Sequence, residues 1–143
     1  MPIPITSHFT LDEWTCKDGT IYPSAWIPER LAPLCQVLEV IRTACGDRPI
    51  TILCGFRSPS YNAKLIAQGH HGVASGSQHV EGRAADITVA GMAPSDVHAA
   101  ILALEADGQV PQLGGLGIYP GWVHVDVRPR VPAGHLARWS DLP

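Results

Sequence analysis

One run of alternating residues near the C-terminal end constrains the fold more than any other feature. Residues 123–127 are Val-His-Val-Asp-Val. Because successive side chains of a strand point to opposite faces, the valines share one face, while His124 and Asp126 share the other. A second apolar run, residues 84–89, contains Asp86, and burying a carboxylate is costly unless it is paired or bound to a cation. We therefore expect two strands that send valines to a core and polar groups to a cleft.

The remaining sequence predicts the elements around these strands. Apolar residues spaced three and four positions apart predict helices over residues 28–45, 60–68 and 94–106. Short β-rich runs predict strands at 49–54 and 84–89 and a hairpin formed by 113–119 and 122–127. Two segments are predicted to be irregular: an N-terminal arm, 1–27, with one helical turn after Thr10, and a tail, 129–143, anchored by Trp139.

Length and charge limit what such a fold can do. A chain of 143 residues, 45% of them hydrophobic, is expected to form one domain over residues 1–143. The 10 Lys and Arg residues are outnumbered by 13 Asp and Glu residues and are dispersed along the chain. This charge balance argues against nucleic acid as a partner, because there is no basic patch to hold a phosphate backbone.

Other classes are excluded by patterns that the sequence lacks. No stretch approaches the length needed to span a bilayer, and the first residues lack the basic-then-apolar pattern of a signal peptide. We therefore expect a soluble protein that is synthesised in the cytoplasm. The four cysteines contain no C-x-x-C pair, so we expect free and mostly buried thiols rather than a zinc knuckle or a redox pair.

Three residues form a candidate metal site. His79, Asp86 and His124 supply the two imidazoles and one carboxylate that a catalytic zinc uses while its fourth position stays open to water. Each residue also has a simpler interpretation when taken alone. Asp86 could cap a loop or pair with Arg83, and His124 could be a hydrogen-bonded core histidine.

The joint pattern favours the metal site. The motif Ser77-x-His79-x-x-Gly82-x-Ala84-x-Asp86 resembles, at every fixed position, that of the zinc D-alanyl-D-alanine carboxypeptidase family, whose fold is shared with the Hedgehog signalling domain. The resemblance covers most of the chain. Similarity to small single-domain phage and bacterial members extends over residues 8–14, 55–62 and 122–126.

This resemblance implies both a fold and a ligand set. The fold is expected to be α+β, with an antiparallel central sheet flanked by helices, and the zinc ligands are expected to be His79, Asp86 and His124. Arg57 matches the family arginine that holds the developing oxyanion or a substrate carboxylate, although a structural salt bridge is an alternative. Ser77 matches a serine near the substrate, and its alternative is a hydroxyl that satisfies the loop backbone.

The sequence departs from the family pattern at the general base. Many members carry an acid three residues before the second zinc histidine, and Gly121 occupies that position here. Asp126 is the first substitute, because it shares a strand face with His124 about 7 Å along the strand. Asp126 could instead accept a hydrogen bond behind the zinc histidine. Glu81 is a weaker and exposed candidate.

Two functional classes follow from the resemblance. The first is a zinc peptidase, of carboxypeptidase or endopeptidase type, that hydrolyses amide bonds in peptidoglycan stem peptides or cross-links. The second is a non-catalytic domain that binds zinc and the cell wall, or a structural part of a phage tail or virion. We expect a monomer whose partner is a peptidoglycan peptide. We expect it to reach the wall after lysis as a phage endolysin does, in a virion or by non-classical export.

Overall fold

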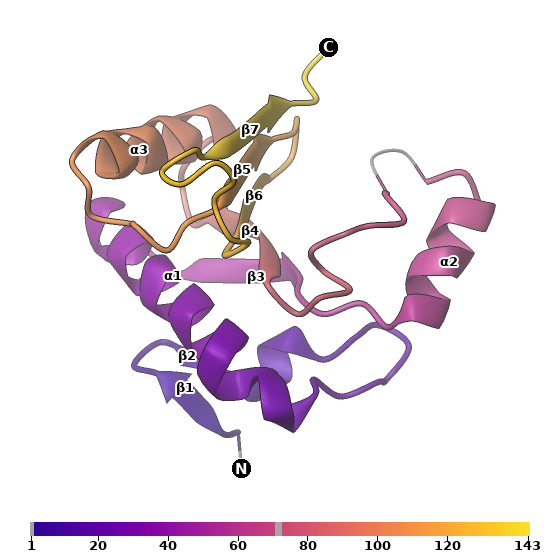
Figure 1. The fold of residues 1–143 in the computed structure, drawn as a ribbon. Coiled ribbons are helices and arrows are strands. Elements are labelled where there is room, and N and C mark those ends of the chain that lie inside the picture. Colours follow the sequence, from indigo (N-terminus) through magenta and orange to yellow (C-terminus); the bar gives the residue numbers. More distant parts are fainter. Residues whose placement is uncertain (1, 71–72) are drawn as a thin grey trace.

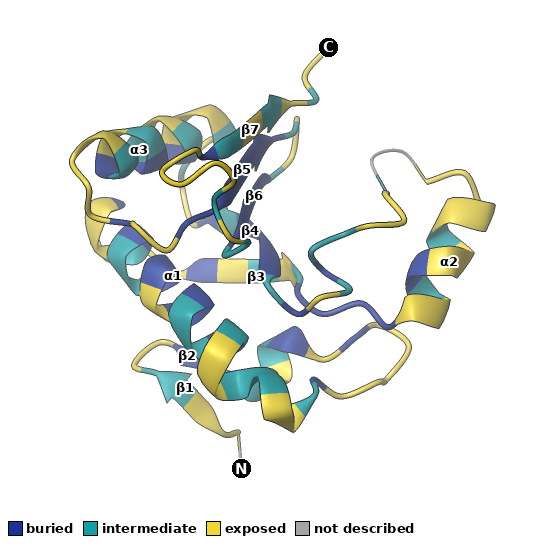
Figure 2. Cartoon of the chain, in the orientation of Figure 1, coloured by how far each residue is buried: buried dark blue, intermediate teal, exposed yellow. Residues whose placement is uncertain are grey.

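The computed structural model describes residues 2–70 and 73–143, which form a five-stranded sheet with helices on both sides (Figure 1). The strand order in the sheet is β3-β4-β6-β5-β7. The strands are β3 (Ile50–Cys54), β4 (Ala84–Val89), β5 (Gly115–Ile118), β6 (Val123–Asp126) and β7 (Ala137–Ser140). Strands β4, β5 and β6 lie at the centre and are almost entirely buried (Figure 2).

Two of the three α-helices cover one face of the sheet. Helices α1 (Ala32–Ala44) and α3 (Pro94–Ala106) contact each other, and α3 contacts β4, β5 and β6. Helix α2 (Pro59–Ala67) lies on the other side and is largely exposed (Figures 1 and 2). The three predicted helices and the four predicted strand segments are thus confirmed, and the core lies between the sheet and the pair α1 and α3. Its largest fully buried members include Leu34, Leu38, Ile41, Ile87, Ile101 and Leu116.

The sheet differs from the predicted one at one edge. Strands β3, β4, β6 and β5 are antiparallel neighbours as predicted, but β7 runs parallel to β5. The fold is α+β with a mixed sheet, so the predicted antiparallel central sheet is matched only in part, and the prediction of an irregular tail is wrong at β7. The residues of β7, Ala-Arg-Trp-Ser, lack an apolar alternation. Instead, Trp139 lies opposite Gly117, where the missing side chain leaves room for the indole.

The N-terminal arm is less irregular than predicted. It contains a small hairpin, β1 (Pro4–Thr6) and β2 (Phe9–Thr10), followed by a 3-10 helix, η1 (Leu11–Trp14). The predicted turn after Thr10 is present, and the Glu13 carboxylate accepts a hydrogen bond from the Thr10 amide over 2.8 Å. Two short helical segments then lead into α1: η2 (Ser24–Trp26) and η3 (Ile27–Leu31).

The arm also binds the start of β4 and the loop before it. Trp14 Nε1 donates to the Ala84 carbonyl over 3.3 Å, and the Tyr22 hydroxyl donates to the Gly82 carbonyl over 2.6 Å. Both donors are buried, so these hydrogen bonds are shielded from water. The arm therefore fixes the backbone of the segment that carries His79.

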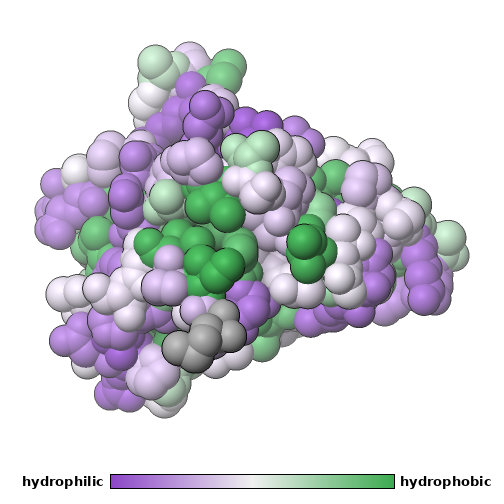
Figure 3. Space-filling model, turned by 90° about the horizontal axis from the view of Figure 1, so that it is seen from below, coloured by the Kyte–Doolittle hydropathy of each residue, from purple (hydrophilic) through white to green (hydrophobic). Residues whose placement is uncertain are grey.

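The surface features of the protein say little about its function. None of the described helices is long and apolar enough to cross a membrane. All four cysteines are free, and three of them are buried, as the sequence predicts. A few large hydrophobic side chains remain exposed, among them Ile3, Ile21 and Val131. Seen from below, hydrophobic residues form a small cluster surrounded by hydrophilic ones (Figure 3).

Glu39 joins the N-terminal hairpin to α1. Its carboxylate accepts hydrogen bonds from the Thr6 hydroxyl, 2.7 Å, and the His8 amide, 2.8 Å. Burial opposes the charge, but these hydrogen bonds and His8 outweigh it and hold the pKa of Glu39 below its ordinary value. A carboxylate with a lowered pKa in the folded state stabilises the fold above its unfolded pKa, and the contribution is lost as pH falls through the folded pKa.

We therefore predict that Glu39→Gln lowers the free energy of unfolding by about 1 kcal/mol at pH 7, because a partly exposed charged hydrogen bond is lost. The difference from the wild type should shrink as pH falls below about 4.3, the ordinary pKa of a glutamate. Urea unfolding at pH 7, 5 and 3.5 measures this difference. Glu29→Gln, at an exposed glutamate, is the matched control. A gap between wild type and Glu39→Gln that does not change with pH would contradict the prediction.

Candidate active site

The register between β4 and β6 pairs two of the predicted ligands. Asp86 lies directly opposite His124 in this antiparallel pair, on the face turned away from α1 and α3. His124 Nδ1 is 3.1 Å from Asp86 Oδ1. The valines on either side of His124 point into the core, as the alternation predicts. The pairing is therefore a direct consequence of strand register.

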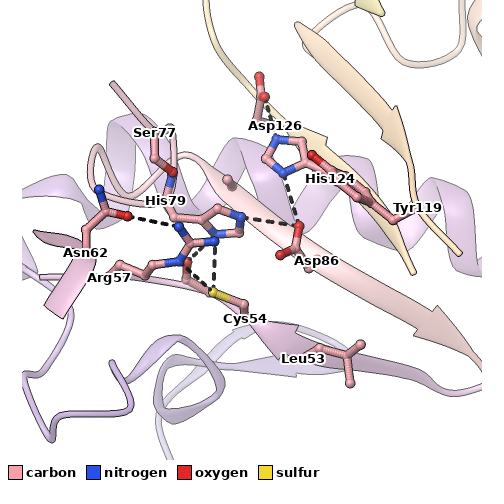
Figure 4. Close-up of polar contacts among 12 residues, drawn as sticks. Leu53, Cys54, Arg57, Asn62, Ser77, His79, Asp86, Tyr119, His124 and Asp126 are labelled. Atoms are coloured by element: carbon pink, nitrogen blue, oxygen red, sulfur yellow. Dashed lines mark hydrogen bonds and ion pairs between the residues drawn. The ribbon is translucent and has the colours of Figure 1, made fainter. Parts of the chain in front are cut away.

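The third ligand comes from the loop before β4. His79 Nε2 is 3.2 Å from the same oxygen, Asp86 Oδ1 (Figure 4). The loop turns sharply at Gly82, whose φ is +68°, and a Cβ there would collide with the Trp26 ring and the Tyr22 hydroxyl. The motif glycine is thus required both by its backbone conformation and by close packing. The structure brings His79, Asp86 and His124 together.

In each imidazole one ring nitrogen, here called the inner nitrogen, faces Asp86. The other, the outer nitrogen, has an acceptor of its own. The Gly55 carbonyl lies 2.7 Å from His79 Nδ1, and Asp126 Oδ2 lies 2.7 Å from His124 Nε2. A carbonyl or carboxylate only accepts, so each outer nitrogen carries a proton. In a neutral ring the inner nitrogen then directs a lone pair at Asp86 Oδ1. Two lone pairs and an anionic oxygen around one point repel each other unless a cation lies between them, so the donor set fits zinc.

The electrostatics of these side chains support this assignment. Burial disfavours a charged His79, but the Asp86 carboxylate outweighs it and raises the pKa of His79 to about 10. Burial likewise disfavours a charged Asp86, yet the two histidines hold its pKa well below the usual range. The point where the three side chains meet thus favours positive charge, which a metal cation would supply.

Cys54 lies close to the same residues. The potential ligand atoms of Cys54, His79 and Asp86 lie within 4.8 Å of one another. However, Cys54 Sγ is 3.6 Å from His79 Nδ1, the nitrogen that the Gly55 carbonyl already engages. Asp86 lies against the opposite nitrogen of the ring. We therefore place Cys54 behind His79, outside the ligand set. The candidate ligands remain His79, Asp86 and His124.

Asp126 is fully buried and lies on the far side of His124 from Asp86. Arg128 holds its two oxygens in a fork, with N–O distances of 2.9 and 2.7 Å. Burial opposes the charge, but His124 and Arg128 lower the pKa of Asp126 to about 2. A Cβ at Gly115 would collide with this carboxylate, so β5 needs glycine there. This geometry favours the role of acceptor behind the histidine over that of general base.

Arg57 is a buried cation whose side-chain partners are the sulfur of Cys54 and the amide oxygen of Asn62. Its Nε donates to Cys54 Sγ over 3.3 Å, and its Nη1 donates to Asn62 Oδ1 over 2.9 Å (Figure 4). No ion pair of Arg57 with an acid occurs among the described residues. Its alternative role, a structural salt bridge, therefore has no support there. A fixed guanidinium that has no carboxylate partner among the described residues suits an anionic group of a substrate.

The structure shows the backbone role considered for Ser77, and its role near the substrate stays a prediction. Its hydroxyl oxygen accepts a hydrogen bond from the His79 amide over 3.1 Å, which satisfies the loop backbone. The same side chain lines the cavity in front of the ligand set. Glu81, by contrast, is exposed and does not line this cavity, and Gly121 lies in an exposed turn.

These side chains line a cavity of about 640 Å³. Its walls also contain aromatic residues that the sequence analysis did not assign to the site: Tyr61, Tyr119, Trp122 and Trp139. Tyr119 and Trp122 flank the hairpin turn next to His124, a proximity visible in sequence, whereas Trp139 arrives through the unpredicted strand β7. Asp86 is the only carboxylate among the lining residues that the structure describes. His70 lines the cavity, and His71 lies outside the described residues.

The sequence model of the peptidase M15 family matches residues 7–126, which include all three converging side chains. The chain belongs to the peptidase M15 family. This confirms the zinc-peptidase family that the motif predicted, while the carboxypeptidase subtype and the phage type stay predictions.

Two curated proteins are also similar to this chain. A probable peptidoglycan L,D-endopeptidase MepK of Haemophilus influenzae is 34% identical over 100 residues, covering 67% of this chain and 50% of the relative. The peptidoglycan L,D-endopeptidase MepK of Escherichia coli K12 is 36% identical over 84 residues, covering 57% of this chain and 42% of the relative. The matches thus span half of these relatives or less.

The placement of Asp126 generates a prediction about zinc binding. Asp126→Asn should weaken zinc affinity about 10- to 100-fold, because the acceptor that orients His124 and increases its basicity is lost. Competition with a chromophoric chelator measures the affinity. Glu81→Gln, at an exposed acid outside the cavity, should bind zinc as the wild type does. If Asp126→Asn kept its zinc affinity and lost only turnover, Asp126 would act in the reaction itself.

Proposed function

We propose that this M15 chain is a zinc-dependent peptidase that hydrolyses an amide bond in peptidoglycan cross-links. The observation that carries the proposal is the convergence of His79 Nε2 and His124 Nδ1 on Asp86 Oδ1, with both outer nitrogens engaged by acceptors. This arrangement presents three ligands and leaves the fourth side open to the cavity. When bound there, zinc would supply Lewis-acid polarisation of the scissile carbonyl and a water of lowered pKa.

The residues around the ligand set support binding of a peptide. Arg57 offers a buried positive charge on the His79 side of the cavity, where an anionic oxygen of the substrate would be stabilised. Ser77 lines the same cavity, and its hydroxyl, whose oxygen accepts from the His79 amide, can also donate its proton to a substrate oxygen. The aromatic walls exclude water from the substrate, which strengthens these polar contacts.

The shape of the cavity favours an endopeptidase over a carboxypeptidase. Its lining extends past the ligand set in two directions. On the His79 side it reaches Leu65 of α2 and the loop after that helix, and on the His124 side it reaches Trp122 and Trp139. A peptide can therefore continue on both sides of the scissile bond. The peptidoglycan endopeptidases among the relatives support the same choice.

A second candidate function has one observation in its favour. Apart from Asp86, which both histidines engage, no carboxylate lines the described part of the cavity, and Gly121 takes the place of the expected acid. A domain that binds zinc and the cell wall without cleaving it would have this composition. The two candidates differ in whether new peptide termini appear.

We predict that the zinc-loaded protein converts cross-linked peptidoglycan dimers to monomers. His79→Ala, which removes a ligand, should reduce this release at least about 100-fold, because transition-state stabilisation by the metal is lost. Mass spectrometry of digested, purified cell walls identifies the new termini, and circular dichroism checks that the variant is folded. Release of single terminal residues from uncrosslinked peptides would instead show a carboxypeptidase. Equal release by wild type and His79→Ala, with wall binding retained, would support the second candidate.

A further inference from the structure

Tyr119 follows β5 at the start of the hairpin turn and lines the cavity beside the ligand set. Its amide donates a hydrogen bond to the Trp122 carbonyl over 3.0 Å, which closes the turn. The two rings stack, with their centroids 4.8 Å apart and an angle of 12° between their planes. The phenol ring is therefore held flat against Trp122, which limits the positions that its hydroxyl can take.

A third aromatic residue fixes the hydroxyl itself. Trp139 Nε1 donates a hydrogen bond to the Tyr119 oxygen over 2.9 Å. An indole N–H can only donate, so the phenol oxygen accepts here and keeps its own proton for another partner. In residues 2–70 and 73–143, no group accepts that proton. The hydroxyl is thus a pre-oriented donor in the wall of the cavity.

The same tryptophan ties this hydroxyl to the ligand set. The Trp139 ring lies 5.0 Å from the His124 ring, centroid to centroid, so the atom that binds the phenol lies next to the second histidine. Figure 4 shows the hydroxyl end of Tyr119 directed toward His124. Arg57 reaches the site from the His79 side through its contact with Cys54. In the view of Figure 4, Tyr119 and Arg57 lie on opposite sides of Asp86.

We propose that Tyr119 is a catalytic residue whose hydroxyl donates a hydrogen bond to the scissile carbonyl oxygen as that oxygen gains negative charge. The proposal rests on the peptidase function proposed above. During hydrolysis a water oxygen bonds to the carbonyl carbon, the carbon–nitrogen bond breaks, and the leaving nitrogen receives a proton from that water. The phenol keeps its proton throughout. A donor fixed before the reaction stabilises the transition state without reorganisation.

This role concerns the negative charge on the carbonyl oxygen and does not replace the general base, which has to accept a proton. The carboxylate of Asp86 is engaged by both histidines and cannot stabilise negative charge, so that task falls to hydrogen-bond donors. A purely structural role for Tyr119 would depend on its ring, which stacks on Trp122, and not on its oxygen. Removing the oxygen alone separates the two roles.

Tyr119→Phe removes the hydroxyl and keeps the ring. We expect kcat for cross-linked dimers to fall about 100-fold, the usual effect of losing one such donor, while KM changes less than about twofold. Trp139→Phe is the matched variant, because it removes the other half of the same hydrogen bond and leaves the phenol in place. Its loss should be about tenfold or less. Zinc stoichiometry should match the wild type in both variants.

A binding measurement gives a second readout that does not depend on turnover. Isothermal titration calorimetry compares zinc-loaded wild type and Tyr119→Phe with a phosphinic peptide, which mimics the tetrahedral transition state, and with the cleaved product peptide. We expect the variant to lose about 100-fold in phosphinate affinity and to keep its product affinity. Equal phosphinate affinities, equal losses for both ligands, or no phosphinate binding by the wild type would each overturn the role of Tyr119.

The two proposals can fail separately. If the wild type cleaves no cross-link but binds the phosphinate, the proposed function fails, and the calorimetric comparison still decides the role of Tyr119. If the wild type cleaves and Tyr119→Phe keeps kcat within threefold of it, the peptidase function stands and the role of Tyr119 is wrong.

Discussion

The contact between Asp86 and His124 across β4 and β6 is the constraint on which the site depends. Both side chains point to the same face because their strands are antiparallel and in this register, and a shift of one residue would turn one of them into the core. The large apolar surface that α1 and α3 cover fixes the register, since Val123 and Val125 are buried on the opposite face. The hydrophobic core thereby sets the position of polar groups that it does not touch.

Orientation of the histidines is a separate problem from their position. A backbone carbonyl at Gly55 and the carboxylate of Asp126 engage the outer nitrogens, and each acceptor is itself held in place. The Asp126 carboxylate fits because β5 offers only a glycine opposite it. Ordering of this kind lowers the entropy cost of metal binding, because the rings already face the common point.

Much of the fold and the ligand set could be predicted, and the reasons are local. Apolar residues at intervals of three and four positions predicted the helices. The alternation of apolar and polar residues around His124 predicted that its side chain lies on the face of the sheet opposite the core. The motif gave His79 and Asp86. The Gly55 carbonyl could not be predicted, because a backbone acceptor has no side-chain signature. Trp139 could not be placed because β7 joins the sheet by a parallel pairing between segments remote in sequence, and its residues show no strand period.

Strand β7 has a consequence for the dynamics of the cavity. It is a four-residue edge strand that pairs with β5, and every second residue along it is exposed. Edge segments of this kind open locally at a lower free energy than the central strands, without unfolding of the whole domain. Since Trp139 is carried by β7, one wall of the cavity can fray and re-form while β4 and β6 keep the histidines and Asp86 in place. Access to the cavity and the geometry of its ligands are thus controlled by parts of the sheet with different local stabilities.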